Sequence, residues 1–371
     1  MKDKVIYFSG LNGLRAIAAL AVVASHITLA LKEFNLDPFI FGTFKDGTPK
    51  GLSLAGYGVS IFFVLSGFLI TYLLQAEKDI QSIDVKKFYV RRILRIWPLY
   101  YLYLLISVIV ILMVGLELDL KSLFLYFFYA ANVPFILGTG LPFLEHYWSL
   151  GVEEQFYLFW PWFNKKINNF IVPIIGFFIA ILLGTKVCLH FFYPNTVLEL
   201  AITISRFHCM MIGAIGAILF KNENKLFLKI TDNKISQYIC WLIILLVAIN
   251  KFHFASIIDN EIICIVALVL IIGQINIKNR IVNLEINVLD YLGKISYGIY
   301  VIHPLLIFLF SQFLNKVNLK APYKYLFVYT VILATTILIS HVSYSYFEKY
   351  FLKLKGKFVV VGSAATKHFN S

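Results

Sequence analysis

Two ionisable side chains, Arg15 and His26, interrupt the first apolar run of the chain and lie eleven residues apart. An α-helix turns by about 100° per residue, so this spacing makes nearly three full turns and brings both side chains to one face. At about 1.5 Å of rise per residue, they lie about 16 Å apart along the axis. That separation suits a long, thin ligand with an anionic end at Arg15 and a reactive end at His26. The alternative is that Arg15 extends to the membrane surface and His26 makes one structural hydrogen bond.

A second apolar run, "HYWSLGVEEQFYLFWPWF", contains two adjacent carboxylates, Glu153 and Glu154. A charge at the centre of a membrane helix costs about 2.5–3.5 kcal/mol. Adjacent side chains point about 100° apart, so at most one of the two faces a given groove squarely. Trp148 has an ordinary explanation as a residue of the membrane interface. Counted along the helix from Trp148, Glu153 falls close to the depth of His26 in the membrane. We expect Glu153 to contact His26, because a neighbouring carboxylate orients an imidazole and stabilises its cation.

Two further ionisable residues reach a similar depth in later runs. Arg206 lies in "ITISRFHCMMIGAIGA" and His303 lies in "YLGKISYGIYVIHPLL". His303 precedes Pro304, which removes a helical hydrogen bond, so its ring either satisfies freed backbone or belongs to a site. His208 is only two residues from Arg206 and faces elsewhere, which favours a structural role.

The short loop "KKFYVRRILRIWPLYY" carries three arginines, Arg91, Arg92 and Arg95. Positive charge there is explained by topology and lipid headgroups. Arginine in place of lysine at the membrane edge indicates bidentate recognition of phosphate. The preceding span, "GYGVSIFFVLSGFLI", is rich in small residues, including Ser66. These favour close helix packing, or leave narrow clearance beside a threaded ligand.

Composition places these residues in a membrane. The chain has 371 residues, of which 60% are hydrophobic and 14% charged, and apolar runs of about 20 residues recur throughout, each long enough to cross a bilayer. The fold class we expect is all-α, a polytopic transmembrane helix bundle. The net charge of +13 is concentrated in short loops, which argues against nucleic acid as a partner. The four cysteines are isolated and show no metal-ligand spacing, so we expect no metal.

About ten spans are predicted, with residues 122–137 forming a re-entrant or interfacial segment on the outer side. With ten spans, the loops on one side hold 20 Lys and Arg residues and the opposite loops hold eight. Positive loops face the cytoplasm, so both termini are expected there. The spans are expected near 11–32, 53–75, 96–116, 147–163, 170–190, 199–220, 235–252, 258–277, 288–314 and 323–350. We expect one transmembrane domain over 1–352 and a short cytoplasmic tail over 353–371, with no soluble domain.

The motifs, taken in order, resemble the acyltransferase-3 family of bacterial integral membrane acyltransferases. Arg15 followed by His26 matches the family's first motif, and the "GVSIFFVLSG" element that ends at Gly67 matches the second. The "RRILRI" run, the "WSLGVEEQFYL" block and the late "SYGIYVIHPLL" also fit. The resemblance covers nearly the whole chain, roughly from Tyr7 to Phe351.

This resemblance implies transfer of an acyl group, usually acetyl from acetyl-CoA, to a hydroxyl of a glycan or lipid-linked sugar. His26 would be the general base, oriented by Glu153. Cationic groups would hold the CoA phosphates, and other polar or aromatic groups would support the substrates. The cationic groups are Arg15, Arg91, Arg92 and Arg95, and the supporting residues are Ser66, Trp148, Glu154, Arg206 and His303.

The resemblance also implies a location and partners. The protein would be a multi-pass protein of the bacterial inner membrane, in contact with membrane lipids. Some relatives carry a fused extracytoplasmic esterase-like domain. This chain is expected to lack one, so the membrane domain or a separate extracytoplasmic partner would handle the acceptor. Two alternatives remain open: a transporter or flippase for an anionic solute, and an acyltransferase for a small hydrophobic molecule.

Overall fold

The computed structural model describes residues 6–44, 47–167 and 170–361. Helices form almost all of the ordered secondary structure there, and no β-strand occurs within these ranges. Antiparallel pairing among the described residues is limited to an isolated bridge between Thr43 and Pro49. The expected all-α fold is confirmed.

In the part of the chain that the structure describes, seven helical segments are long and apolar enough to cross a bilayer. They include α1 (Leu11–Leu29), α2 (Ser53–Lys78), α3 (Val85–Met113), α7 (Ile171–Phe192), α14 (Ser296–Leu314) and α15 (Ala321–Ser343). The broken helix α8–α9 (Val197–Ser205 and Phe207–Lys221) is the seventh. An eighth forms if α10 (Lys225–Thr231) and α11 (Lys234–Ala248), bent by 50°, are taken as one span.

The other two predicted spans fall on shorter or more polar helices. These are α6 (Tyr147–Lys166) and α12 (Asp259–Ile275). The predicted span 288–314 consists of α13 (Asn287–Lys294) and α14, which meet at Ile295. About ten spans is therefore an approximate count, and the structure supports an integral membrane protein.

Residues 122–137 form two short helices, as expected for a segment that does not cross the membrane. They are α4 (Leu120–Phe127) and α5 (Asn132–Leu137). Eight residues of helix rise only about 12 Å, against about 30 Å of hydrocarbon. Tyr129 has a left-handed backbone between them, with φ of 57°. Helix α5 then packs against α6 and α8.

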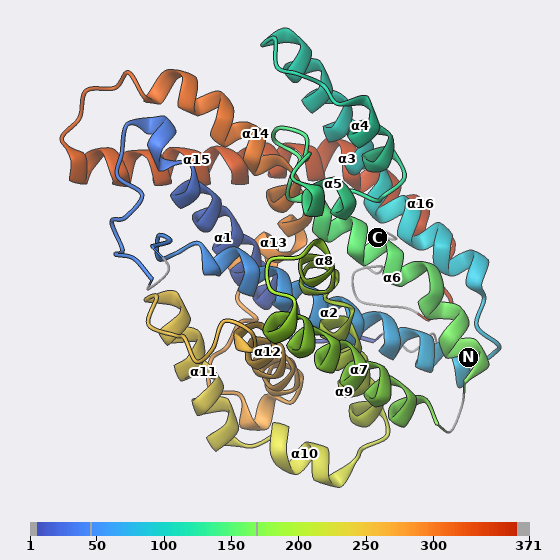
Figure 1. The fold of residues 1–371 in the computed structure, drawn as a ribbon. Coiled ribbons are helices and arrows are strands. Elements are labelled where there is room, and N and C mark those ends of the chain that lie inside the picture. The colour runs from blue at the N-terminus through green and yellow to red at the C-terminus, as the bar shows by residue number, and fades with distance from the viewer. Residues whose placement is uncertain (1–5, 45–46, 168–169, 362–371) are drawn as a thin grey trace.

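Helix α2 lies at the centre of the bundle, in contact with α1, α6, α9 and α12 (Figure 1). Small residues allow this arrangement. A Cβ atom added at Gly67 would come within 1.9 Å of the Met210 carbonyl oxygen on α9. One added at Gly58 would come within 2.7 Å of the Ala18 carbonyl oxygen on α1. Backbone contact at both positions fixes how α2 is placed against the helices that carry Arg15 and Arg206.

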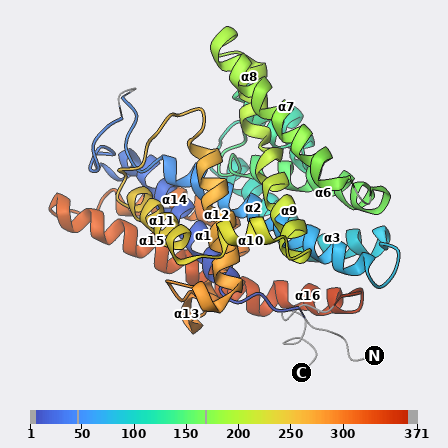
Figure 2. The same ribbon diagram turned by 90° about the horizontal axis from the view of Figure 1, so that it is seen from below.

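The last long helix continues beyond the expected end of the bundle. After α15, a π-helical turn (Tyr344–Glu348) leads into α16 (Lys349–Gly356). Figure 2 shows α15 and α16 following one another in nearly one line, and α16 packs against α3. The expected tail, 353–371, therefore starts inside a helix. Its residues 362–371 lie outside the described residues.

Candidate active site

A cavity of about 590 Å³ lies among α1, α2, α3, α6, α13, α14 and the C-terminal segment. Its volume is in the range of small-molecule sites, about 300–1,000 Å³. Six of the eleven residues predicted for the site line it: Arg15, Ser66, Arg91, Arg92, Arg95 and Glu153. These come from four different helices, so the bundle has brought together motifs that are far apart in the sequence.

The cavity is strongly cationic. Among the described residues, seven lysine or arginine side chains and three carboxylates line it, which is a formal excess of four positive charges. The Arg91 guanidinium lies 3.4 Å from Glu77, and the Lys294 ammonium lies 2.7 Å from Asp290. Two carboxylates are therefore already paired within the protein. The unbalanced charge of the remaining groups favours an anionic ligand with several charges.

Two of the arginines are held by neighbouring side chains. Arg15 donates from Nη1 to Oδ1 of Asn12, one turn earlier on α1, at 2.8 Å. The Arg92 guanidinium lies over the rings of Phe88 and Tyr157, 5.6 Å from each centroid. Its Nε is buried and has no hydrogen-bond partner within the described residues. An orphaned guanidinium donor of this kind fits a phosphate ligand.

Glu153 faces this cavity and is held by two hydroxyl groups. Ser66 on α2 and Tyr157, one turn along α6, both donate to its Oε1. The expected contact between Glu153 and His26 is wrong: no hydrogen bond or ion pair joins them in the described structure. Glu153 belongs to the cationic cavity, near Arg15.

His26 pairs with a second imidazole. Its Nδ1 lies 2.6 Å from Nε2 of His303, and the two rings stack with centroids 4.9 Å apart. His303 Nδ1 lies 3.0 Å from the Ile299 carbonyl oxygen. His303 therefore contacts both backbone and His26, and its place in a site stays a prediction.

The partners of His303 determine the tautomers of both neutral rings. A carbonyl oxygen only accepts, so Nδ1 of His303 carries the proton. Its Nε2 is then an acceptor, and His26 must donate from Nδ1. The lone pair of His26 is left on Nε2, where a general base needs it.

The depth estimate for α6 was wrong by about two turns. At the level of the histidine pair, α6 presents its first residues, because His146 lies 5.4 Å from His303 between ring centroids. Glu153 is seven residues further along, about 10 Å at 1.5 Å per residue. Trp148 was taken as an interface marker, but it is buried and contacts Phe63 and Phe135.

His146 was missed because it lies at the very start of α6. Its Nε2 lies 3.1 Å from the Val301 carbonyl oxygen, and its Nδ1 is buried without a partner. Its position next to the "YWSLG" block was the feature of the sequence that could have identified it as a candidate. It makes a third imidazole beside His303.

Three side chains that line the cavity also lie next to the histidine cluster. Tyr300 donates its hydroxyl to the His146 carbonyl oxygen at 3.0 Å and lies 2.5 Å from Ser149 Oγ. Phe62 packs edge-on against Tyr300 at 6.0 Å. Phe62, Ser149 and Tyr300 line the cavity, whereas His26 and His303 do not.

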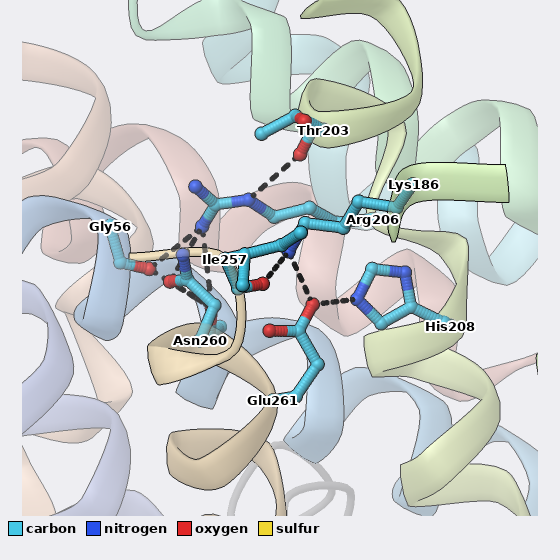
Figure 3. A network of polar contacts seen from close by, with 9 residues as sticks. Gly56, Lys186, Thr203, Arg206, His208, Ile257, Asn260 and Glu261 are labelled. Carbon is cyan, nitrogen blue, oxygen red and sulfur yellow. Dashed lines mark hydrogen bonds and ion pairs between the residues drawn. The ribbon is translucent and has the colours of Figure 1, made fainter. Parts of the chain in front are cut away.

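Arg206 occupies a separate polar network (Figure 3). It has a left-handed backbone, φ 42°, at the break between α8 and α9. Its Nη1 donates to the Gly56 carbonyl oxygen at 2.9 Å and approaches Asn260 Oδ1 at 3.4 Å. The guanidinium lies 5.5 Å from the centroid of the Trp148 ring. Arg206 and Trp148 thus contact each other, away from the cavity lining.

The same view contains a buried ion pair next to Arg206 (Figure 3). Lys186 Nζ lies 2.7 Å and His208 Nε2 lies 3.0 Å from Oε1 of Glu261. These contacts join α7, α9 and α12. Glu154 is elsewhere: it accepts from Trp97 Nε1 at 3.3 Å and does not line the cavity. The described residues contain no group of three or more His, Cys, Asp or Glu side chains placed to hold a metal ion.

Residues 8–344 match the sequence model of a family that is described as an acyltransferase domain. The chain belongs to the acyltransferase-3 family. The resemblance inferred from the motifs is confirmed. The match ends at Tyr344, so α16 lies beyond the part of the chain that the family model covers. No solved structure matches this acyltransferase-3 protein.

Three curated relatives are named as O-acetyltransferases. Peptidoglycan O-acetyltransferase OatA of Listeria monocytogenes is 39% identical over 171 residues, covering 42% of this chain and 24% of that protein. A putative O-acetyltransferase of Staphylococcus aureus is 28% identical over 384 residues, covering 94% and 58%. Putative peptidoglycan O-acetyltransferase YrhL of Bacillus subtilis is 37% identical over 174 residues, covering 42% and 24%. The chain spans less than two thirds of the length of each of these relatives.

Proposed function

We propose that this acyltransferase-3 protein is a membrane O-acetyltransferase that moves an acetyl group from acetyl-CoA to a hydroxyl of a glycan or lipid-linked sugar. One observation carries the proposal: a cationic cavity begins beside Arg15, and a histidine pair lies beyond its inner end, further along the same helix, α1. The spacing of Arg15 and His26, about 16 Å along the helix, suits a donor with phosphates at one end and a thioester at the other.

The donor would enter from the side of the arginine-rich loop. Arg15, Arg92 and Arg95 would hold its phosphates, and Arg91 would contribute through its place beside Glu77. The pantetheine arm would run along α1 toward Phe62 and Tyr300. These two side chains pack against each other in the cavity lining, and Tyr300 also contacts His303, so we expect them to shift when the thioester reaches His26.

Catalysis would use the lone pair on Nε2 of His26. This nitrogen takes the proton from the acceptor hydroxyl. At the same time, the hydroxyl oxygen attacks the carbonyl carbon of the thioester. The new C–O bond forms as the C–S bond breaks, and the thiolate leaves with the proton that His26 has held. His303 orients the ring and accepts its Nδ1 proton in a hydrogen bond.

The acceptor class is inferred from the named relatives. Two of them are named as peptidoglycan O-acetyltransferases, which supports a glycan acceptor for this chain. We place the donor side in the cytoplasm, both termini on that side, and the protein in the bacterial inner membrane. A separate extracytoplasmic partner remains part of the proposal.

The test is transfer of radiolabelled acetyl from acetyl-CoA in reconstituted vesicles. Muropeptides and lipid-linked disaccharides serve as acceptors, and His26→Ala is the matched inactive control. We expect labelled ester on the acceptor and release of CoA thiol in equal amounts, both absent in the folded His26→Ala protein. Uptake of an anionic solute without acetyl transfer would instead identify a transporter.

A further inference from the structure

We infer that the C-terminal segment 349–361 completes the donor site, with Lys355 as a ligand for a phosphate group. This inference rests on the proposed function and deepens it. Helix α16 and the residues after it supply Lys349, Leu352, Lys355, Val359 and Val361 to the cavity lining. The family model ends at Tyr344, so neither the motifs nor the family match assigns a role to this segment.

Lys355 lies in the cationic cavity without a counter-ion of its own. It is half-buried and lines the same cavity as Arg15, Arg92 and Arg95. Within the described residues, the side chains of Lys355 and Arg95 make no hydrogen bond and no ion pair. Removing a cation from water without a partner is costly, and like charges placed together add repulsion. An anion in the cavity relieves both effects.

The segment is attached to the arginine cluster as well as lying near it. Arg91 Nη1 donates to the Phe358 carbonyl oxygen at 2.9 Å, while its Nη2 lies 3.4 Å from Glu77. Arg91 thus ties the turn after α16 to α2 and α3. Because α16 also packs along α3, the position of Lys355 relative to Arg92 and Arg95 is fixed from two sides.

The charge of the cavity indicates what kind of anion fits. The lining carries an excess of four positive charges, and a phosphate monoester carries about 1.5–2 negative charges at neutral pH. A donor with a phosphate monoester and a diphosphate therefore balances the cavity better than a single phosphate does. The apolar side chains of Leu352, Val359 and Val361 would cover the non-phosphate parts of such a ligand.

A phosphate could also come from an anionic lipid headgroup, so the experiment separates the two sources. Full-length protein is placed in nanodiscs of phosphatidylcholine alone, and binding of CoA and of pantetheine is measured by calorimetry. Lys355→Met removes the charge but keeps the length of the side chain. Lys353→Met is the matched control, because Lys353 is exposed on the same helix and does not line the cavity.

We expect Lys355→Met to weaken CoA binding at least tenfold and to leave pantetheine binding unchanged. Lys355→Arg should restore most of the affinity for CoA, and Lys353→Met should bind as the original protein does. Thermal unfolding of each variant checks that it is folded. If Lys355→Met fails to fold, Lys355→Gln takes its place.

Three results would overturn the inference. One is undiminished CoA affinity in folded Lys355→Met, which leaves the proposed function intact. A second comes from a parallel sample in nanodiscs that also contain phosphatidylglycerol. If native mass spectrometry shows that Lys355→Met loses bound phosphatidylglycerol while CoA affinity is unchanged, Lys355 is a ligand for lipid. The third is absence of CoA binding in the unaltered protein, which removes the proposed function together with this inference.

Discussion

At the scale of single residues, hydrogen-bond donors and acceptors determine what each ionisable group can do. His26 faces an imidazole that accepts its proton, and the second nitrogen of that imidazole is occupied by the Ile299 carbonyl oxygen. A neutral His303 in this position orients His26 without adding charge to an apolar region. Glu153, which the sequence suggested for that role, instead adds one negative charge to a cavity dominated by cations.

The first prediction concerns His303 as a positioning residue. Replacing His303 by Ala should lower kcat about 10²-fold or more, because the His26 ring loses the partner that sets its tautomer. The KM for acetyl-CoA should change little, since His303 does not line the donor cavity. The double variant with His26→Ala should be no slower than His26→Ala alone. Steady-state acetyl transfer in vesicles measures all three, and a multiplicative loss in the double variant would contradict the pairing.

The second prediction concerns Glu153→Gln. Its amide oxygen still accepts from the Ser66 and Tyr157 hydroxyls, so the local structure should persist. Loss of one negative charge from a cationic cavity should tighten CoA binding, by about threefold or more if the charge is worth about 0.7 kcal/mol. Calorimetric titration at low and high salt gives the measurement, with the larger effect expected at low salt. Weaker CoA binding in the folded variant would contradict this placement of Glu153.

At the scale of elements, small residues on α2 decide how the cationic cavity is placed relative to the polar network around Arg206. Gly67 lets α9 approach to backbone contact, and Gly58 does the same for α1. The small-residue pattern predicted close packing. The same span also carries Ser66 into the cavity and Ser60 toward Arg206.

The third prediction therefore concerns Gly67→Ala. The new Cβ would lie 1.9 Å from the Met210 carbonyl oxygen, so α2 and α9 would have to separate. We expect destabilisation of about 1–3 kcal/mol, as for overpacked cores. The matched control is Gly184→Ala on α7, where nothing lies within 4 Å of an added Cβ. Thermal unfolding in detergent should fall for the first variant and stay level or rise slightly for the second.

At the scale of the whole molecule, charge asymmetry between loops predicts the orientation in the membrane. The fourth prediction is that Lys166, at the end of α6, faces the cytoplasm and Glu117, between α3 and α4, faces outward. Both side chains are exposed, so cysteines introduced there in a background without Cys188, Cys209, Cys240 and Cys264 should be reachable. An impermeant thiol reagent added to intact cells should label position 117 alone. Labelling of position 166 with protection of 117 would reverse the orientation.

Local sequence pattern was enough to predict the four arginines that line the cationic cavity. Arg15, Arg91, Arg92 and Arg95 are charged residues next to apolar runs, and such residues collect at one end of a membrane bundle. The short helices at 122–137 were also predictable, because Asn132 and Pro134 interrupt an apolar run that is otherwise long enough to span. The family followed from the order of the motifs.

Tertiary structure decided the depth of each side chain in the membrane and the direction in which it points within the bundle. Sequence spacing measures distance along one helix, and it carries no information on how far one helix slides past another. The sequence predicted Glu153 at the level of His26. In the structure α6 is displaced by about two turns relative to α1, and His146 lies at that level instead. The role that we propose for α16 likewise depends on packing against α3. This packing brings Lys355 to arginines about 260 residues earlier in the chain, where no periodicity could have placed it.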